Sequence, residues 1–229
     1  MPDPIYATND GRAIHYSTSN WVDARSSGTA NTSTITNQEV SSIEVAHVTA
    51  GRGEQWSISR LFLTFDTTSI SISPVSAKLN IRGLTNGDLD VIALKSDYSP
   101  DGATLDIYDY GAITNAETPL TNTNGSGAGT LAGTSVVEYS GELTTWSTSG
   151  FNEIVLNADA LSDIVSLDAF KVCVIDYDYD YLDIELGNGN TLRNGSYFSS
   201  KGGTSHDPYL SYVAEVAAAD NATFFGANF

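Results

Sequence analysis

Apolar and polar positions alternate with a period of two over most of this chain, and Gly, Asn and Pro interrupt the alternation at short intervals. The clearest segment is Ser59 to Asp66, an arginine-led apolar run, and a second run follows at Ala77 to Ile81. Such alternation is typical of β-strands, whereas helical spacing is rare in this chain. The pattern predicts an all-β, antiparallel β-sandwich with the Ser59 to Asp66 strand at its centre.

An Asn-Gly pair at Asn86-Gly87 separates the segment Lys78 to Arg82 from the segment Leu89 to Leu94. Asn-Gly accepts the positive φ angles of a type I′ turn, so the two segments are predicted to be antiparallel neighbours in a hairpin. Asn-Gly pairs at residues 124, 188 and 194 predict further turns, and the tract from Thr121 to Thr134 reads as a long surface loop.

The second half of the chain predicts short strands with one helix among them. Asn157 is placed to cap a helix over residues 158–165, which we expect to be the only one. The strands are predicted at Phe151 to Leu156, Phe170 to Ile175, Leu182 to Leu186, Ser196 to Ser199 and Tyr209 to Val213. We therefore expect one domain over residues 1–213 and a separate Ala- and Phe-rich tail over residues 214–229.

The net charge of the chain limits which kinds of molecule it is expected to bind. The 28 acidic and 10 basic residues give a net charge of −18, which repels nucleic acid phosphates and anionic lipids. The apolar runs are far shorter than the roughly 20 residues that span a bilayer, and the start lacks the basic and apolar regions of a signal peptide. Neither nucleic acid nor membrane is an expected partner. The lone Cys173, between two valines, is interpreted as a buried strand residue.

Three segments together resemble the DNRLRE-type jelly-roll domains, a class related to carbohydrate-binding modules and common in phage and prophage virion proteins. The first is Ser59 to Ile70, which leads into Ala77 to Ile81. The second is Gly150 to Asn157 and the third is Tyr197 to Tyr212. The resemblance implies a jelly-roll β-sandwich in which the matching residues are structural, and it carries over no catalytic residue.

The run Asp176-Tyr177-Asp178-Tyr179-Asp180-Tyr181 places carboxylates at alternate positions. In a strand they would share one face and the tyrosines the other. An EF-hand is excluded because Tyr181 and Gly187 stand where glycine and glutamate are needed. Three interpretations remain open: an irregular calcium site, a binding surface lined by Tyr177, Tyr179 and Tyr181, and a solvated strand edge, which is favoured.

Other chemistry-bearing residues give weaker signals. His15, His47 and His206 lack metal-ligand spacing and are interpreted as surface or loop residues, and a nucleophile motif is absent from the sequence. No catalytic residue, metal or cofactor is expected. Trp56 is interpreted as a core residue, whereas Trp146, in a Ser- and Thr-rich segment, is the candidate for stacking on a sugar.

The tail carries Phe224, Phe225 and Phe229. Three exposed phenylalanines would be a solubility liability, so docking onto a neighbouring subunit is favoured over a disordered end or packing on the chain's own sandwich.

The leading functional hypothesis is a non-enzymatic virion protein assembled in the host cytoplasm and displayed on the particle surface as a capsid decoration, head fibre or tail appendage. Its expected partners are other virion proteins, further copies of itself and host surface glycans. A carbohydrate-binding or adhesin module of a cell-surface protein is the second hypothesis. A polysaccharide-active jelly-roll enzyme is the third.

Overall fold

The structure is a computed structural model, and it describes residues 3–27, 29–35, 40–51, 53–96, 131, 136–198 and 205–215. Its strands are β1 (Ile5–Ser17), β2 (Thr32–Ile35), β3 (Val40–Ala50), β4 (Gly53–Asp66), β5 (Ser76–Thr85), β6 (Val91–Lys95), β7 (Phe151–Val155), β8 (Ala169–Asp176), β9 (Asn190–Tyr197) and β10 (Tyr209–Val213). The helices are α1 (Trp21–Ser26), α2 (Ala158–Ser166) and a π-helical turn, η2 (Tyr177–Tyr181).

Every strand pairing is antiparallel, which confirms the predicted all-β, antiparallel class. The strands follow one another in the order β2-β1-β10-β5-β9-β3-β4-β8-β6, and β7 lies on the other edge of β5. Because β4 also pairs with β1, the path closes on itself. We call β7, β10, residues 76–82 of β5 and the first residues of β1 the small sheet. The last residues of β5 pair with β9 and belong, with the remaining strands, to the large sheet.

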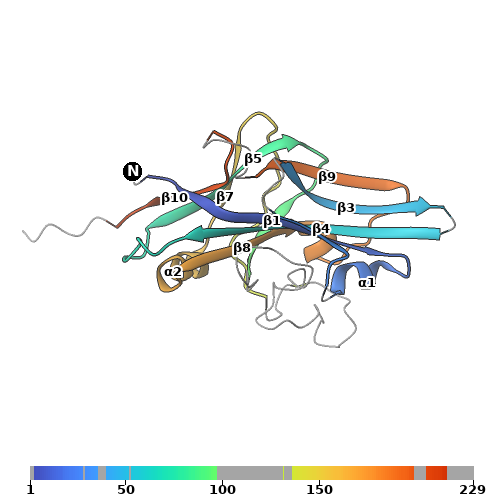
Figure 1. Cartoon of the computed structure of the whole chain (residues 1–229), viewed down its shortest axis with the longest axis horizontal. Coiled ribbons are helices and arrows are strands. Elements are labelled where there is room, and N and C mark those ends of the chain that lie inside the picture. The colour runs from blue at the N-terminus through green and yellow to red at the C-terminus, as the bar shows by residue number, and fades with distance from the viewer. Residues whose placement is uncertain are drawn as a thin grey trace, which may run out of the picture.

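Strand β4 is the centre of the large sheet, as the sequence predicted. β1 pairs with one of its edges, while β3 and then β8 pair with the other (Figure 1). Both faces of β4 are buried, and alternate residues enter different cores. Leu61, Leu63 and Phe65 belong to the core between the two sheets, whereas Ile58 and Phe62 belong to a second core on the opposite face.

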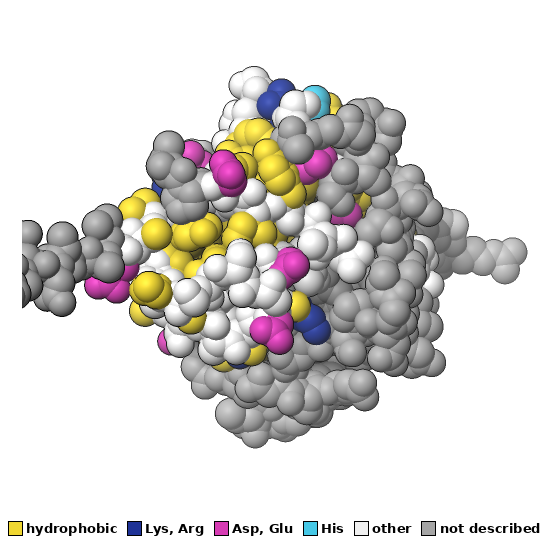
Figure 2. Space-filling model, turned by 60° about the vertical axis from the view of Figure 1, so that its left-hand side comes forward, with side chains coloured by type: hydrophobic (Ala, Val, Ile, Leu, Met, Phe, Trp, Pro, Cys, Tyr) yellow, Lys and Arg dark blue, Asp and Glu magenta, His cyan; other side chains and the backbone are white. Residues whose placement is uncertain are grey.

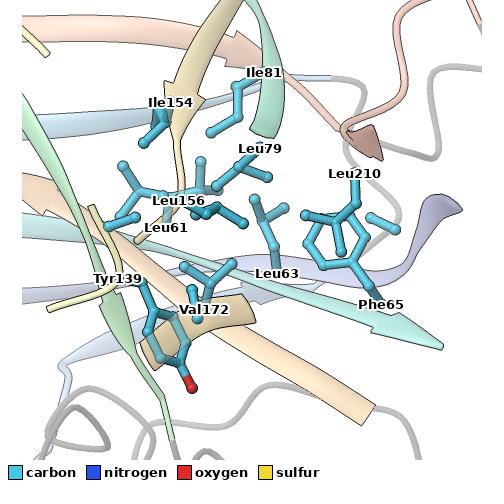
Figure 3. Close-up of a cluster of buried hydrophobic side chains, with 14 of the residues drawn as sticks. Leu61, Leu63, Phe65, Leu79, Ile81, Tyr139, Ile154, Leu156, Val172 and Leu210 are labelled. Carbon is cyan, nitrogen blue, oxygen red and sulfur yellow. The ribbon is translucent and has the colours of Figure 1, made fainter. Parts of the chain in front are cut away.

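The main core fills the space between the sheets. Figure 3 shows Leu79 and Ile81 of β5 and Ile154 of β7 pointing towards Leu61 and Leu63 of β4. Burial of apolar side chains from both layers is the main driving force for such packing.

The second core lies under α1 and η2. Trp21 and Ala24 of α1 and Tyr181 of η2 pack there against Phe62. The predicted core residue Trp56 also lies there, so that prediction is confirmed.

The helix expected after Asn157 is present as α2, and the Asn157 side chain accepts a hydrogen bond from the Ala160 amide at 3.1 Å. The prediction that it would be the only helix is wrong, because α1 and η2 are also present. Asn20 caps α1 by accepting from the Asp23 amide at 2.8 Å. α1 is too short to show a helical period in the sequence.

The predicted hairpin between β5 and β6 is also wrong. β5 pairs with β7, β9 and β10, and β6 pairs with β8, so residues 86–90 cross from the β9 edge of the large sheet to β6 at its other edge. The positive φ of 60° falls on Asp88. The buried Asn194 side chain holds this crossing: its Oδ1 accepts from the Gly87 amide at 2.9 Å and its Nδ2 donates to the Leu89 carbonyl at 2.7 Å.

Of the remaining predictions about strands and turns, some are confirmed and others are wrong. β7, β8 and β10 form close to their predicted bounds, whereas Leu182 to Leu186 forms no strand. Asn194-Gly195 lies inside β9, while Asn188-Gly189 does form a turn with Gly189 at a φ of 88°. Apart from Leu131, the predicted 121–134 loop lies outside the described residues. Within the described ranges no helix is long and apolar enough to cross a membrane.

Candidate ligand-binding cleft

A cleft of about 610 Å³ opens beside β7. Its walls are formed by residue 86 with residues 88–90 of the β5–β6 crossing, by residues 143–147, and by residues 151–153 of β7. The cleft therefore lies between the edge strand β7 of the small sheet and the segment that joins β5 to β6. Its lining offers amide, hydroxyl, carboxylate and aromatic side chains.

Trp146, the predicted sugar-stacking residue, lines the cleft but is only 6% exposed. Its indole Nε1 donates to the Gly195 carbonyl at 3.2 Å, which anchors the ring between β9 and the cleft. Gly83 of β5 makes room for it, because a Cβ at Gly83 would stand 2.9 Å from that same Nε1. Trp146 therefore forms a fixed part of the wall.

Asn152 of β7 fastens the 143–147 segment to the small sheet. Its Oδ1 accepts from the Ser147 amide at 2.7 Å, and its Nδ2 donates to the carbonyls of Ser147 at 3.1 Å and Ile81 at 3.2 Å. The neighbouring Phe151 is half-buried and also lines the cleft. With Asn152 and Asn194 holding two walls, the cleft is largely preformed, as ligand sites usually are.

Acidic residues gather along one side of the cleft. The Tyr177 amide donates to the Asp90 carbonyl at 2.8 Å, which brings η2 next to the cleft wall. Partial desolvation, a hydrogen bond with Asp90 and the charges of Asp90 and Asp178 raise the pKa of Glu142. Asp88 and Glu153 add two more carboxylates to the lining. The electrostatic potential here disfavours an anionic ligand.

The Asp/Tyr run is not the extended strand that the sequence predicted. It forms η2, and the Asp176 carboxylate caps it by accepting from the amides of Tyr179 at 2.5 Å and Asp180 at 3.3 Å. Because the chain turns here, the carboxylates leave the common face: Asp180 is buried at 0% exposure, while Asp178 lies beside Asp90 and Glu142. This corrects the strand-edge interpretation.

The three tyrosines of this run differ in exposure. Tyr181 is 3% exposed, and its hydroxyl donates to Glu138. Tyr177 stacks on Tyr181 with ring centroids 5.3 Å apart, and both Tyr177 and Tyr179 are half-buried. These rings therefore contribute mainly to the second core. None of them lines the cleft in the described part of the chain.

Asp176 is the most perturbed carboxyl of this region. Burial raises its pKa to about 8, the amides of Tyr179 and Asp180 oppose the shift, and the charges of Asp180 and Asp178 add to it. Its Oδ2 has no hydrogen-bond partner among the described atoms. At neutral pH this carboxyl is therefore protonated, and the run carries less charge than its sequence indicates.

The remaining candidate residues lie elsewhere. His47 is buried in β3, where its ring stacks on Trp56 at 4.5 Å and its Nδ1 lies 2.7 Å from the Leu186 carbonyl, so the surface interpretation is wrong for this residue. Cys173 is buried in β8 as expected, and burial raises the pKa of its thiol. Among the described residues no cluster of three or more His, Cys, Asp or Glu side chains is arranged to hold a metal ion. Phe224, Phe225 and Phe229 lie outside the described residues.

Sequence reasoning missed most of the cleft wall. Asn86 was interpreted only as a turn residue, and Phe151 and Asn152 only as part of a strand. The available signal was Asn152 and Asn194, since buried Asn side chains usually fix backbone groups that lack a ladder partner.

No protein-family model matches the chain, and no curated protein matches it in sequence. The resemblance to the DNRLRE-type domains therefore stays a prediction.

Proposed function

We propose that this chain is a non-enzymatic glycan-binding domain with a jelly-roll β-sandwich fold, and that it holds its ligand in the cleft beside β7. One observation carries the proposal. The cleft is preformed, of ligand size, and lined by aromatic and hydrogen-bonding side chains. Sugars present both apolar ring faces and hydroxyl groups, so this mixture suits them better than it suits a purely apolar ligand.

The charge of the cleft selects among glycans. Asp88, Asp90 and Glu153 line it, and Glu142 stands beside it. Juxtaposed like charges cost several kcal/mol at an interface, as an order of magnitude. We therefore expect neutral glycans to bind and glycans that carry carboxylate or sulfate groups to be rejected.

The proposal extends to where the domain works: on the surface of a virion, as a decoration, fibre or appendage subunit. The resemblance to virion-associated jelly-roll domains supports this setting, and the net charge of −18 suits a face turned away from packaged nucleic acid. A cell-surface adhesin module is the alternative setting for the same cleft. The two settings differ in what the domain is attached to.

Glycan-array binding by the full chain tests the ligand. We expect neutral glycans to be retained, and Phe151→Ala to lower affinity at least about tenfold, since it removes the half-exposed ring of the cleft. Tyr209→Ala is the matched control, because Tyr209 contacts Phe151 at 5.0 Å but does not line the cleft. Retention of acidic glycans only, or equal loss in both variants, would contradict the cleft assignment.

Two further measurements separate the alternatives. If shortened glycans were released during incubation, the chain would be a polysaccharide-active enzyme and not a non-enzymatic binding domain. Mass spectrometry of purified virus particles tests the setting: the chain should be present at a fixed ratio to the other particle proteins. Recovery of the chain only with cell envelopes would favour the adhesin.

A further inference from the structure

The outer face of the small sheet is a second surface, which meets the cleft at Phe151 and Glu153 of β7. Leu79 and Ile81 of β5 point into the main core, so Lys78, Asn80 and Arg82, which alternate with them along the strand, point outwards. Figure 2 shows the side of the molecule that lies to the left in Figure 1, where hydrophobic side chains gather in patches with acidic side chains beside them.

One end of this face is apolar. Val155 of β7 is 62% exposed, Val213 of β10 is 49% exposed and Val75, directly before β5, is 64% exposed. The Val75 amide donates to the Val213 carbonyl at 2.8 Å, so these two lie together. A hollow of about 330 Å³ beside them is lined by Lys78, Val213 and Tyr209. Exposed apolar groups gathered in this way usually mark an interaction surface.

The other end of the face carries aromatic rings. Tyr209 of β10 lies 5.0 Å from Phe151 of β7 and 5.8 Å from Tyr6 of β1, measured between ring centroids. Leu84, two residues beyond Arg82 on β5, is 36% exposed. The face therefore presents valines at the Ser76 end of β5 and aromatic groups with a leucine towards its far end.

Within the part of the chain that the structure describes, the Arg82 guanidinium has no carboxylate partner. Its guanidinium lies 5.8 Å from the centre of the Phe151 ring, and among the described residues it forms no ion pair and its Nε has no hydrogen-bond partner. On the same face Lys78 is paired with Glu153 at 2.5 Å. In a chain with 28 acidic and 10 basic residues, an unpaired arginine is an attractive position for a carboxylate from elsewhere.

The segment that best fits this face is residues 216–229, which follow directly from it. β10 ends at Val213, opposite Ser76, at the valine end of the face. The segment begins with the small apolar run Val216 to Ala219, continues with Asp220 and carries three phenylalanines but no Lys or Arg. Its order of apolar, acidic and aromatic residues matches the order of groups along the face.

The distances agree with this order. From Ser76 to Arg82 the β5 strand extends about 20 Å, and the seven residues from Val213 to Asp220 can span about 23 Å. Asp220 can therefore reach Arg82, with Val216 to Ala219 extended along β5 between the valines and Arg82. Phe224 and Phe225, a few residues further on, then come to the end of the face where Leu84 is exposed.

We propose that residues 216–229 dock along the outer face of the small sheet of their own chain, with Asp220 paired to Arg82. A covalently attached segment that starts at the rim of its site has an effective concentration in the millimolar range, as an order of magnitude. The same segment from a second copy would be present only at the concentration of the protein in solution, so the attached segment has the advantage. The phenylalanines are then covered without a neighbouring subunit.

Paramagnetic broadening in NMR spectra of the full chain tests this docking. A nitroxide is attached to the variant Gly226→Cys, and the native Cys173 will not react because it is buried. We expect strong loss of amide signal at Arg82 and Phe151, and little loss at Val48 and Thr49, at the end of β3 that is far from β5. Asp220→Asn should reduce this loss several-fold. Asp159→Asn, an equal charge change at an exposed position on α2, should leave it unchanged.

A mixed sample decides which chain provides the segment. Isotope-labelled chain without nitroxide is mixed with nitroxide-bearing chain that is not isotope-labelled. We expect no broadening in this mixture. Broadening in this mixture would show that the segment docks on a second copy, and it would overturn the proposal. Full signal intensity at Arg82 and Phe151 in the spin-labelled full chain would overturn it as well. Glycan binding is measured separately, so either result leaves the cleft assignment standing.

Discussion

The guanidinium of Arg60 and the carboxylate of Asp180 form a two-pronged ion pair, with Nε 2.7 Å from Oδ2 and Nη2 2.7 Å from Oδ1. Neither side chain is exposed to solvent. Arg25 completes the arrangement: its carbonyl accepts from Arg60 Nη2 at 2.9 Å, and its own Nε donates to the Asp180 carbonyl at 2.5 Å. The pair thus ties the central strand β4 to both α1 and η2.

Removing one member of this ion pair should lower the free energy of unfolding more than replacing both members by apolar residues. Arg60→Met leaves the buried Asp180 carboxylate with only the longer contact to Arg25, whose Nε lies 3.8 Å from Oδ1, and Asp180→Leu removes the carboxylate that both arginines share. Each variant should lower the free energy of unfolding by about 3–5 kcal/mol. The double variant removes both charges and should lose clearly less than the sum of the two. Urea unfolding of the three variants measures the coupling energy.

The exposed pair of Lys78 and Glu153 is the control for this cycle. Its side chains are 44% and 55% exposed, although the Nζ to Oε2 distance is 2.5 Å. Solvent screening limits such a pair to about 1 kcal/mol or less. If its coupling energy equalled that of Arg60 and Asp180, burial would not be what makes the inner pair strong.

Arg60 and Asp180 also illustrate which features of the fold could be predicted from the sequence and which could not. The alternation around Arg60 identified β4, because both faces of that strand are buried and its length is unusual. The partner of this arginine lies 120 residues away, among 28 acidic residues, so the sequence does not identify it. Only the folded chain brings Asp180 to it. Strands are local patterns, whereas ion pairs between distant segments depend on topology.

The cleft could not be predicted from the sequence, also because it depends on contacts between distant segments. Its walls come from the 86–90 crossing, the 143–147 segment and β7, which are adjacent only because β5 and β6 do not pair with each other. The Asn86-Gly87 pattern favoured a hairpin, and Asn194, more than 100 residues further on, decides against it. The Asp/Tyr run misled in the same way, because the Asp176 cap turns an alternating sequence into η2.

Asp176 should make stability depend on pH. The folded chain holds its proton up to about pH 8, whereas an unfolded chain releases it near pH 4, at about 3.9. Between these values the folded state binds more protons, so the free energy of unfolding should fall as pH rises. This one group contributes at most about 1.4 kcal/mol per pH unit, and the loss ends above about pH 8.

Urea unfolding at a series of pH values measures this dependence. Asp176→Asn should remove the contribution, because the amide oxygen can still accept from Tyr179 and Asp180 but does not titrate. Asp178→Asn is the control from the same turn. A pH dependence that survives Asp176→Asn unchanged would assign the titration to another group.

Gly83 and Gly53 should respond in opposite ways to the same methyl group. A Cβ at Gly83 would stand 2.8 Å from Asn152 Nδ2, 2.9 Å from Trp146 Nε1 and closer still to the Ser147 carbonyl oxygen, whereas nothing lies within 4 Å of a Cβ at Gly53. The Ser147 carbonyl is backbone held by Asn152, so it cannot move aside cheaply. Gly83→Ala should therefore lower the free energy of unfolding by about 1–3 kcal/mol through overpacking. Gly53→Ala should leave stability unchanged or raise it slightly, since alanine restricts the unfolded chain. Thermal unfolding of both variants measures the difference, and an equal midpoint for the two would mean that the cleft wall yields more easily than its hydrogen bonds indicate.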